Sequence, residues 1–458
     1  MTLLSQRARF FNESKALFVL GWPLIVNNVI IGLTTFIDFI MAGRLGTLDL
    51  GAVSVASTLW SFVFLAGMGV MMALNPIAAQ LHGANRPTNI GEAGRQGLWL
   101  SLLIALIIFV AIRYASAPFM RLIGIEEPLI PLATGYLQAL AFGSFAIFAF
   151  LGLRFISEGI GHTKPIMMVA IIGLITNATG NYVLMFGNFG APRLGLVGCG
   201  VATAVSMWVS LLFMLTYMHL RKRVYAPLEL FRHFDWPNGA RIREFLRVGL
   251  PIGGSVTAEV GLFSAAGLIM GTLSATEAAA HAVAINYAAT MFMVPLGLHS
   301  ALMIRVGQNV GSGHVSDARY AGWVGICLCG AFMTVSALVL MVFRTPITSL
   351  YVDDPAVRAV AAQLLLLAMI FQITDGIQVG AAGAVRGFKD TTVPMYINIF
   401  AFWVVGFPIA WYAGTQLGFR GEGVWGGLAV GLTVAAILLC WRFHHISRSA
   451  QSAVHSPV

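Results

Sequence analysis

Long apolar stretches recur along the whole chain, and they limit what it can fold into. Each is about 20 residues or longer, the length that an α-helix needs to cross the hydrocarbon core of a membrane. An outer-membrane barrel would instead show alternating segments of about ten residues. Only 10% of the residues are charged, against roughly 25% in a soluble domain. The sequence therefore predicts an all-α membrane protein.

We expect twelve transmembrane helices. The first apolar stretch is too long for the core of a signal peptide and lacks a small-residue cleavage site, so it counts as a span. The predicted spans are 16–43, 51–77, 94–115, 128–153, 166–187, 196–220, 245–272, 280–304, 320–343, 357–385, 394–414 and 423–443.

The basic residues divide unevenly between the two sides of this membrane. An even number of spans puts both termini on one side, and the loops of that side hold 20 of the 27 Lys and Arg residues. Cytoplasmic loops carry such an excess, so both termini are predicted to be cytoplasmic, in a bacterial inner membrane. The assignment leaves no basic residue inside a span. The net charge of +9 then reflects topology, and no nucleic-acid partner is expected.

The two halves of the chain repeat each other. A shift of 228 residues aligns Pro23 with Pro251 and Gly43 with Gly271, among many matches. Each repeat has six spans and begins on the cytoplasmic side, so the two six-helix lobes should be related by a pseudo-twofold axis along the membrane normal. The predicted domains are an N-terminal lobe (1–220), a cytoplasmic connector (221–247) and a C-terminal lobe (248–458).

Three acidic residues remain within the predicted spans: Asp38, Glu259 and Asp375. The position that matches each one in the other repeat is apolar, so the shared fold does not require them. An acid at the centre of a span costs roughly 2.5–3.5 kcal/mol, and such residues usually mark an ion or substrate pathway. The alternative is a structural acid that is hydrogen-bonded to a nearby Ser or Asn.

Polar side chains occupy the turns next to two of these acids. Gln372 and Gln378 lie three residues on either side of Asp375, and Ser255 lies one turn before Glu259. Carboxylate, amide and hydroxyl oxygens suit a hard cation. Carboxylates in apolar surroundings also take up protons readily. The residues leave both uses open.

Two weaker features concern packing. Met291 is one of several methionines on the first two helices of the repeats, where adaptable thioethers could line a cavity for varied cargo, although plain packing is the commoner role. The pairs Gly376/Gly380 and Gly383/Gly387 have the small-xxx-small spacing that allows helices to approach closely. We interpret both glycine pairs as packing contacts.

Several segments resemble the MATE (multidrug and toxic compound extrusion) family, in particular its NorM-like branch, over nearly the whole chain. They are FIDFIMAGRLGTLDLGAVSVA (36–56), NPIAAQLHGA (75–84), EGIGHTKP (158–165), FGAPRLGLVGCGVATA (189–204), AAHAVAIN (279–286), IRVGQNVG (304–311) and ITDGIQVGAAGAVRGFKDTTVP (373–394).

The resemblance implies an exporter of cationic amphiphilic drugs and dyes, driven by sodium ions or protons through alternating access. No cofactor is expected beyond the coupling ion, Na⁺ and/or H⁺, and we expect a monomer. The residues implied to couple transport to a cation are Glu259, Asp375, Phe263, Asp38 and Asn177, with Glu259 and Asp375 as the Na⁺ ligands. Substrate contacts are implied for Asp38 and for an acidic pair at the extracellular mouth, Asp353 and Asp354, to which we add Gln372, Gln378 and Met291.

Other functional classes are weighed against this interpretation. A lipid-linked saccharide flippase shares the wider architecture, but it would be expected to carry basic residues in its cavity for anionic headgroups, and here the intramembrane charge is negative. A membrane-embedded enzyme would need a catalytic constellation, which the sequence does not show. A channel fits isolated buried acids in a duplicated chain less well than alternating access does. We therefore expect a transporter and not an enzyme.

Overall fold

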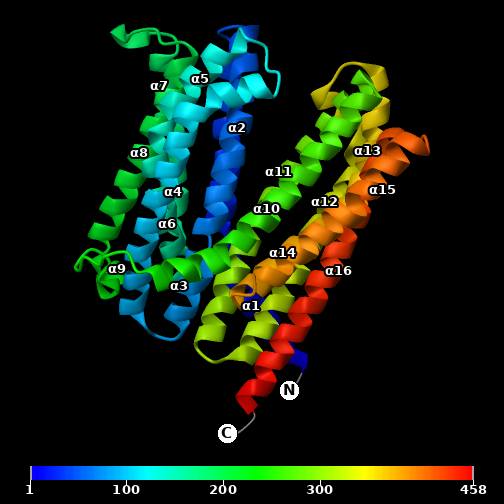
Figure 1. The fold of residues 1–458 in the computed structure, drawn as a ribbon. Helices are drawn as coiled ribbons and strands as arrows, with labels where there is room; N and C mark the ends of the chain where they lie inside the picture. The colour runs from blue at the N-terminus through cyan, green and yellow to red at the C-terminus, as the bar shows by residue number, and fades with distance from the viewer. Residues whose placement is uncertain (1–2, 456–458) are drawn as a thin grey trace. The chain divides into compact units, whose positions relative to one another are not determined.

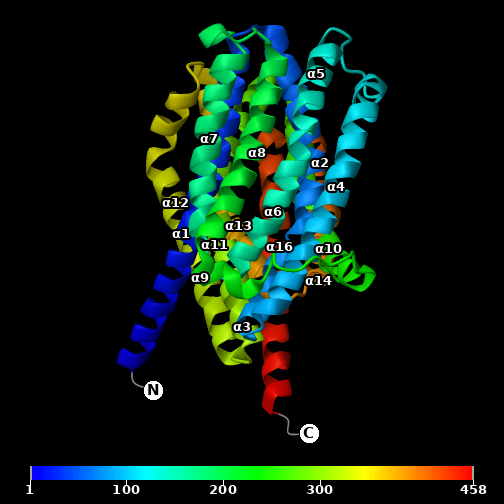
Figure 2. The same cartoon turned by 90° about the vertical axis from the view of Figure 1, so that its left-hand side faces the viewer.

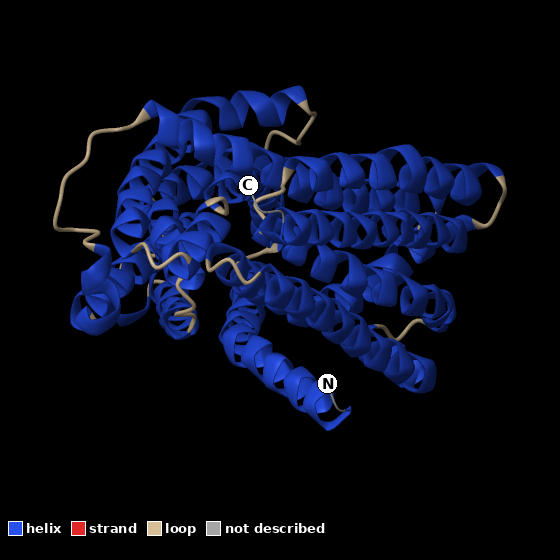
Figure 3. Cartoon of the chain, turned by 90° about the horizontal axis from the view of Figure 1, so that it is seen from below, coloured by secondary structure: helices blue, strands red, loops and turns tan. Residues whose placement is uncertain are grey.

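The computed structural model describes residues 3–455, and helix is the only regular secondary structure within that range (Figure 3). Within residues 3–455, eleven helices are long and apolar enough to cross a membrane. A twelfth span is a helix pair, Leu129–Ala141 and Gly143–Gly159, bent by 46°. The predicted all-α membrane fold with twelve spans is confirmed. Residues 1–2 and 456–458 of the predicted lobes lie outside the described residues.

The chain divides into two compact units. The N-terminal unit comprises Val26–Gly253, and the C-terminal unit comprises Met1–Ile25 together with Gly254–Val458. Two long helices contribute to both units, α1 (Leu3–Gly43) and α10 (Gly239–Leu273). The breaks after Ile25 and Gly253 are 228 residues apart, which is the offset of the sequence repeat.

In the N-terminal unit, α8 packs against α5, α6 and α7, and α4 packs against α5 and α6 (Figure 2). Apolar side chains from these helices form its core. Its further elements are α2 (Thr47–Met71), α3 (Leu74–Gly83), α4 (Pro87–Leu122), α5 (Leu129–Ala141), α6 (Gly143–Gly159), α7 (Lys164–Leu184), η1 (Asn188–Gly190), α8 (Leu196–Leu220), α9 (Lys222–Tyr225) and η2 (Ala226–Leu228).

In the C-terminal unit, α13 packs against α11, α12 and α16, which makes it the central helix (Figure 1). The further elements are α11 (Ala275–Gly311), α12 (Val315–Tyr351), α13 (Pro355–Gly387), α14 (Thr392–Ile399), η3 (Phe400–Gly406), α15 (Phe407–Trp411), η4 (Tyr412–Gln416) and α16 (Arg420–His455).

Glycines allow the close packing of α13, as their spacing predicted. A Cβ on Gly376 or Gly380 would meet backbone atoms of α12, and one on Gly383 or Gly387 would meet backbone atoms of α11. The two small-xxx-small pairs therefore serve two different neighbours. This packing fixes the face of α13 that carries Asp375.

The units differ from the predicted domain boundaries at both linking helices. The start of α1 belongs to the C-terminal unit, where Leu17 lies in a buried apolar cluster with Ala301 and Leu302. Arg305 Nε also lies 2.7 Å from Glu13 Oε1, and Arg9 Nη2 lies 2.7 Å from Asp317 Oδ1. Residues 221–253 belong to the N-terminal unit. Hydropathy marks where a span ends, but not which bundle its ends pack against.

Candidate functional site

Asp38 lies near the end of α1 and is buried in the N-terminal unit. Asn181 Nδ2, on α7, donates a hydrogen bond of 2.6 Å to Asp38 Oδ1 and a second of 3.2 Å to Asn177 Oδ1. Asn177 Nδ2 in turn donates to Thr203 Oγ1 on α8 at 3.1 Å. Hydrogen bonds from amide groups stabilise a buried carboxylate in its charged form.

The resemblance implies a role in cation coupling for Asn177, and the structure places Asn181 of the same helix in hydrogen-bond contact with Asp38. Asn177 follows as the next member of the same network. The segment NATGN puts the two asparagines four residues apart, which is one helical turn and one face of α7. That spacing is the signal that could have identified Asn181.

A cavity of about 290 Å³ opens beside this network within the N-terminal unit. Its walls include Asp38 and Asn177, the aromatic side chains of Trp60 and Tyr136, and Met68. A carboxylate with aromatic faces and a thioether suits an organic cation, because ring faces attract positive charge and methionine adapts its shape. The cavity can therefore hold both the charge and the apolar body of such a molecule.

Helices α6 and α13 run past the predicted span ends and bury charges that the sequence analysis assigned to loops. Glu158 is only 1% exposed, and its carboxylate accepts hydrogen bonds of 2.7 Å from both Arg154 Nε and Asn75 Nδ2. Arg386 is 6% exposed near the end of α13. Arg386 lies one residue beyond the predicted span 357–385, on a helix that continues to Gly387. The partners of these charges include a residue one turn away, Arg154 for Glu158, and residues distant in sequence, Asn75 for Glu158 and His299 for Arg386.

Asp375 is buried on α13 in the C-terminal unit, 4% exposed. Its Oδ1 atom has no hydrogen-bond partner within the described part of the chain. The same holds there for Gln378 Oε1, Gln372 Nε2 and Ser255 Oγ. Gln372 Oε1 is occupied, because Ser336 Oγ donates to it at 2.8 Å. Buried polar atoms are normally satisfied, so these atoms are available to an ion or water.

Glu259 lies half-buried on α10, one turn from Ser255. Its charge interacts with those of Asp375 and Arg386, so the predicted pair of acids is brought together. Phe263 follows one turn later, and its ring packs edge-on against Phe371 at 5.8 Å between centroids. The structure therefore shows Phe263 in contact with another aromatic ring, and the cation contact implied for it stays a prediction.

Arg386 and His299 are the residues of this region that sequence reasoning missed. Arg386 Nη1 lies 3.2 Å from His299 Nε2, and His299 Nδ1 lies 2.8 Å from the carbonyl oxygen of Val379. A carbonyl can only accept, so Nδ1 carries the proton and Nε2 accepts from the guanidinium. His299 is therefore neutral. Its hydrogen bond holds the positively charged guanidinium of Arg386 near Glu259.

The donor set of the C-terminal unit fits a monovalent hard cation. It offers two carboxylates with unpartnered hydroxyl and amide oxygens from Ser255 and Gln378. Across residues 3–455, no three His, Cys, Asp or Glu side chains gather as they would for a structural metal. Two ionised carboxylates and the nearby guanidinium of Arg386 together carry one net negative charge, which matches an ion of charge +1.

The remaining predicted site residues have local structural contacts. Asp354 caps α13, because its Oδ1 accepts a 2.8 Å hydrogen bond from the amide of Ala356. Asp353 is fully exposed and lies 3.1 Å from Arg358. Met291 packs at the edge of the core of the C-terminal unit. Their proposed contacts with substrate stay predictions.

Comparisons with known proteins agree with the repeat. A model of the MatE family matches residues 23–183 and again 251–412, two segments that begin 228 residues apart. The multidrug resistance protein PmpM of Pseudomonas aeruginosa is 38% identical over 98% of this chain and 94% of its own length. A probable multidrug resistance protein NorM of Xanthomonas axonopodis is 40% identical over 97% of each chain. The NorM of Vibrio cholerae is 36% identical over 96% of this chain and 97% of its own length.

Solved structures share the fold. A crystal structure of MATE in the bent conformation aligns with a TM-score of 0.90 at 19% identity, over 97% of each chain. An outward-facing multidrug resistance MATE family transporter aligns with a TM-score of 0.87 at 20% identity, over 96% of this chain and 97% of its own.

Proposed function

Because this chain belongs to the MatE family, we propose that it is a multidrug exporter that exchanges cationic amphiphilic drugs and dyes for sodium ions. Its relatives are named multidrug resistance proteins, so the expected activity is transport and not an enzymatic reaction. It would act as a monomer in a bacterial inner membrane with both termini in the cytoplasm.

The observation that carries the proposal is a pair of buried acidic sites, one in each unit, with different surroundings. Asp38 has its hydrogen bonds already made and borders a cavity with aromatic walls. Among the described residues, Asp375 keeps an unpartnered oxygen, and so does Gln378 one turn later on the same helix. The first site suits a large cation that brings its own apolar surface, and the second suits a small ion that needs several oxygens.

Two such sites can exchange their ligands only if each ligand favours a different conformation. A ligand shifts an equilibrium by its difference in affinity for the two states, and the coupling between two ligands is reciprocal. We therefore expect sodium at Glu259 and Asp375 to weaken cargo binding at Asp38, and cargo to weaken sodium binding equally. Uptake of sodium would then accompany release of drug.

Sodium is preferred over the proton because of the neutral oxygens. A proton alone could relieve the repulsion between Glu259 and Asp375, and it would need no further ligand. The hydroxyl of Ser255 and the amide oxygen of Gln378 are unpartnered, buried and of the type that sodium requires. They support a site for a coordinated ion.

The test is export of an organic cation from reconstituted vesicles at equal, fixed pH on both sides, with and without an inward sodium gradient. We expect the gradient to drive export by the wild type and by Glu422→Gln, which removes an exposed acid outside both sites. Glu259→Gln and Asp375→Asn should abolish export while the protein stays folded. If only a pH gradient drives export and sodium does not compete with cargo, the sodium assignment fails and the carboxylates act as proton carriers.

A further inference from the structure

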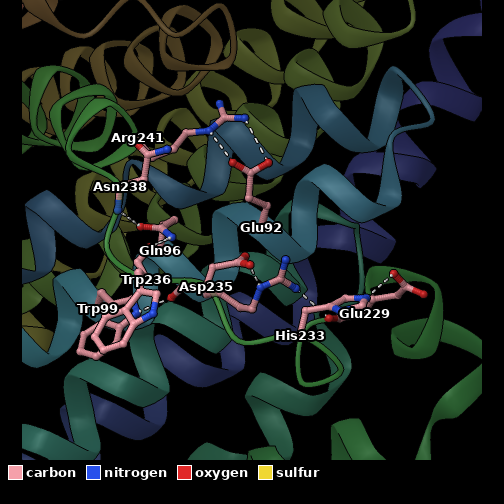
Figure 4. Close-up of polar contacts among 10 residues, drawn as sticks. Glu92, Gln96, Trp99, Glu229, His233, Asp235, Trp236, Asn238 and Arg241 are labelled. Atoms are coloured by element: carbon pink, nitrogen blue, oxygen red, sulfur yellow. Dashed lines mark hydrogen bonds and ion pairs between the residues drawn. The ribbon is translucent and has the colours of Figure 1, made fainter.

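The connector after α8 is held firmly against α4 within the N-terminal unit. Arg95, on α4, makes an ion pair of 2.5 Å with Asp235 and donates to the carbonyl oxygen of Glu229 at 2.7 Å. Gln96 donates to the carbonyl of Trp236 at 2.9 Å and accepts from the amide of Asn238 at 2.7 Å. Figure 4 shows Gln96, Asp235, Trp236 and Asn238 among the polar contacts along the connector.

This network presents aromatic side chains outward. Phe231, Phe234 and Trp236 are 58%, 70% and 76% exposed. The ring of Phe234 lies edge-on to Trp236 at 5.4 Å and to Trp99 of α4 at 6.1 Å. Polar contacts of the connector backbone therefore hold large apolar rings away from the protein core. Rings of this kind are enriched at the boundary between membrane and water.

A groove of about 500 Å³ lies between α4 and this part of the connector. Leu98, Trp99 and Leu102 form one wall, and Leu230 and Phe231 contribute to the other. On α4 the wall continues as a stripe of exposed apolar residues at helical spacing: Leu102, Leu106 and Val110, each 45–49% exposed. Such a stripe on a spanning helix faces lipid. The groove therefore opens onto the hydrocarbon at its Leu102 end, from which the stripe runs toward Val110.

The groove belongs to a basic connector on the predicted cytoplasmic side. Residues 221–247 contain seven Lys and Arg against three Asp and Glu. Arg232 lines the groove with its side chain 73% exposed, and it pairs with the half-buried Glu229 at 2.7 Å, whereas Arg95 is paired with Asp235. A pair with a mostly exposed arginine contributes little, so this guanidinium is free to turn toward a stronger anion. The cytoplasmic leaflet carries anionic lipids that basic segments attract.

We propose that this groove binds an anionic phospholipid of the cytoplasmic leaflet, with an acyl chain along Trp99 and Leu102 and the phosphate at Arg232. The site is distinct from the two acidic sites and does not depend on what the protein transports. It gives the connector a second function: besides joining the two repeats, it anchors the N-terminal unit at a defined depth in the membrane.

The test uses Trp99, in the wall of the groove, as a reporter, in vesicles with the same fraction of dibrominated phosphatidylglycerol or dibrominated phosphatidylcholine. Bromine quenches tryptophan only at short range, and the fluorescence lost in Trp99→Phe isolates this residue from the other tryptophans. We expect about fivefold stronger apparent binding of the brominated phosphatidylglycerol at Trp99, as one basic residue near the surface provides. Arg232→Gln should remove that preference.

Arg121→Gln is the matched control, because Arg121 is also an exposed arginine paired with a glutamate and lies at the other end of α4. It should leave the preference for phosphatidylglycerol unchanged. No quenching of Trp99 by either lipid would show that the groove faces water, and equal quenching by both would show no choice of headgroup. Either result overturns the proposal. It is also overturned if folded Arg232→Gln protein prefers phosphatidylglycerol as strongly as the wild type does.

Discussion

Asp38 and Asp375 are both buried aspartates on spanning helices, yet their hydrogen bonding differs. Asp38 accepts a 2.6 Å hydrogen bond from Asn181, whereas Asp375 has an oxygen with no partner among the described residues. An acid with a fixed amide donor is stabilised in its charged form before any ligand arrives. An acid with a free oxygen gains its partner only when an ion or water binds.

Asn181→Ala should therefore weaken cargo binding although Asn181 need not touch the cargo. A hydrogen bond to a charged group contributes about 1.5–3 kcal/mol, so we expect roughly 10- to 100-fold weaker binding of an organic cation. Equilibrium binding in detergent measures this. The control is Asn188→Ala, which removes an asparagine outside the cavity wall. Equal affinities of Asn181→Ala and wild type would mean that the network does not hold the charge of Asp38.

Arg386→Gln should tighten sodium binding. The guanidinium lies buried near Glu259 and opposes any second cation, and one charge at an effective dielectric of 20 contributes roughly 1–2 kcal/mol. We expect about tenfold higher affinity for radioactive sodium in the glutamine variant. Arg386→Lys keeps the charge and should stay near wild type. A folding defect would weaken sodium binding, so only a gain of affinity supports the view that Arg386 opposes the ion. Unchanged sodium affinity in folded Arg386→Gln protein would contradict it.

At the scale of elements, α13 shows how packing and function share one helix. Its glycines bring α11 and α12 within backbone contact, and the same contact sets His299 against Arg386. A change in the spacing of α11 and α13 would therefore alter the polar site and the core together.

Gly383→Ala should destabilise the protein, because the new Cβ would lie 2.6 Å from the carbonyl oxygen of His299. Overpacking of this kind costs roughly 1–3 kcal/mol. Gly271→Ala is the matched control on another spanning helix: nothing lies within 4 Å of its Cβ, and alanine is the better helix former. Thermal unfolding in detergent should show a lower midpoint for Gly383→Ala only. Equal midpoints would mean that α11 moves aside without cost.

The whole molecule has a direction in the membrane, and the distribution of basic residues predicts it. Arg223 in the connector should be cytoplasmic, and Asp353 in the loop between α12 and α13 should be external. The side chains of Arg223 and Asp353 are both exposed, so a reagent can reach these positions. Tyr225, in the same connector, is unsuitable for labelling because it is buried, with its hydroxyl 2.7 Å from Ser157 Oγ.

Single cysteines at positions 223 and 353, in a background without the four native cysteines, test this direction. Replacement of the native cysteines is necessary because Cys327 is exposed. An impermeant thiol reagent added to intact cells should label position 353 only. Labelling of position 223 but not 353 would invert the topology.

The sequence by itself determined the spans, the duplication and the positions of three intramembrane acids. These features are local: hydropathy over about 20 residues marks a span, and an internal repeat is visible by direct alignment. Even the break between the two units follows the repeat, since Ile25 and Gly253 are one repeat length apart. Helical spacing alone also placed Gly376 and Gly380 on one packing face.

Tertiary structure decided which polar groups meet. Arg386 contacts His299, 87 residues earlier, and Asn75 contacts Glu158, 83 residues later. Neither pair has a sequence signal, because helix packing alone brings such distant residues together. A buried charge is tolerated only beside its partner, and for Glu158 that set of partners is completed by Asn75 from another helix. For the same reason the direct partner of Asp38 is Asn181: the orientation of α7 against α1 sets which asparagine reaches the carboxylate.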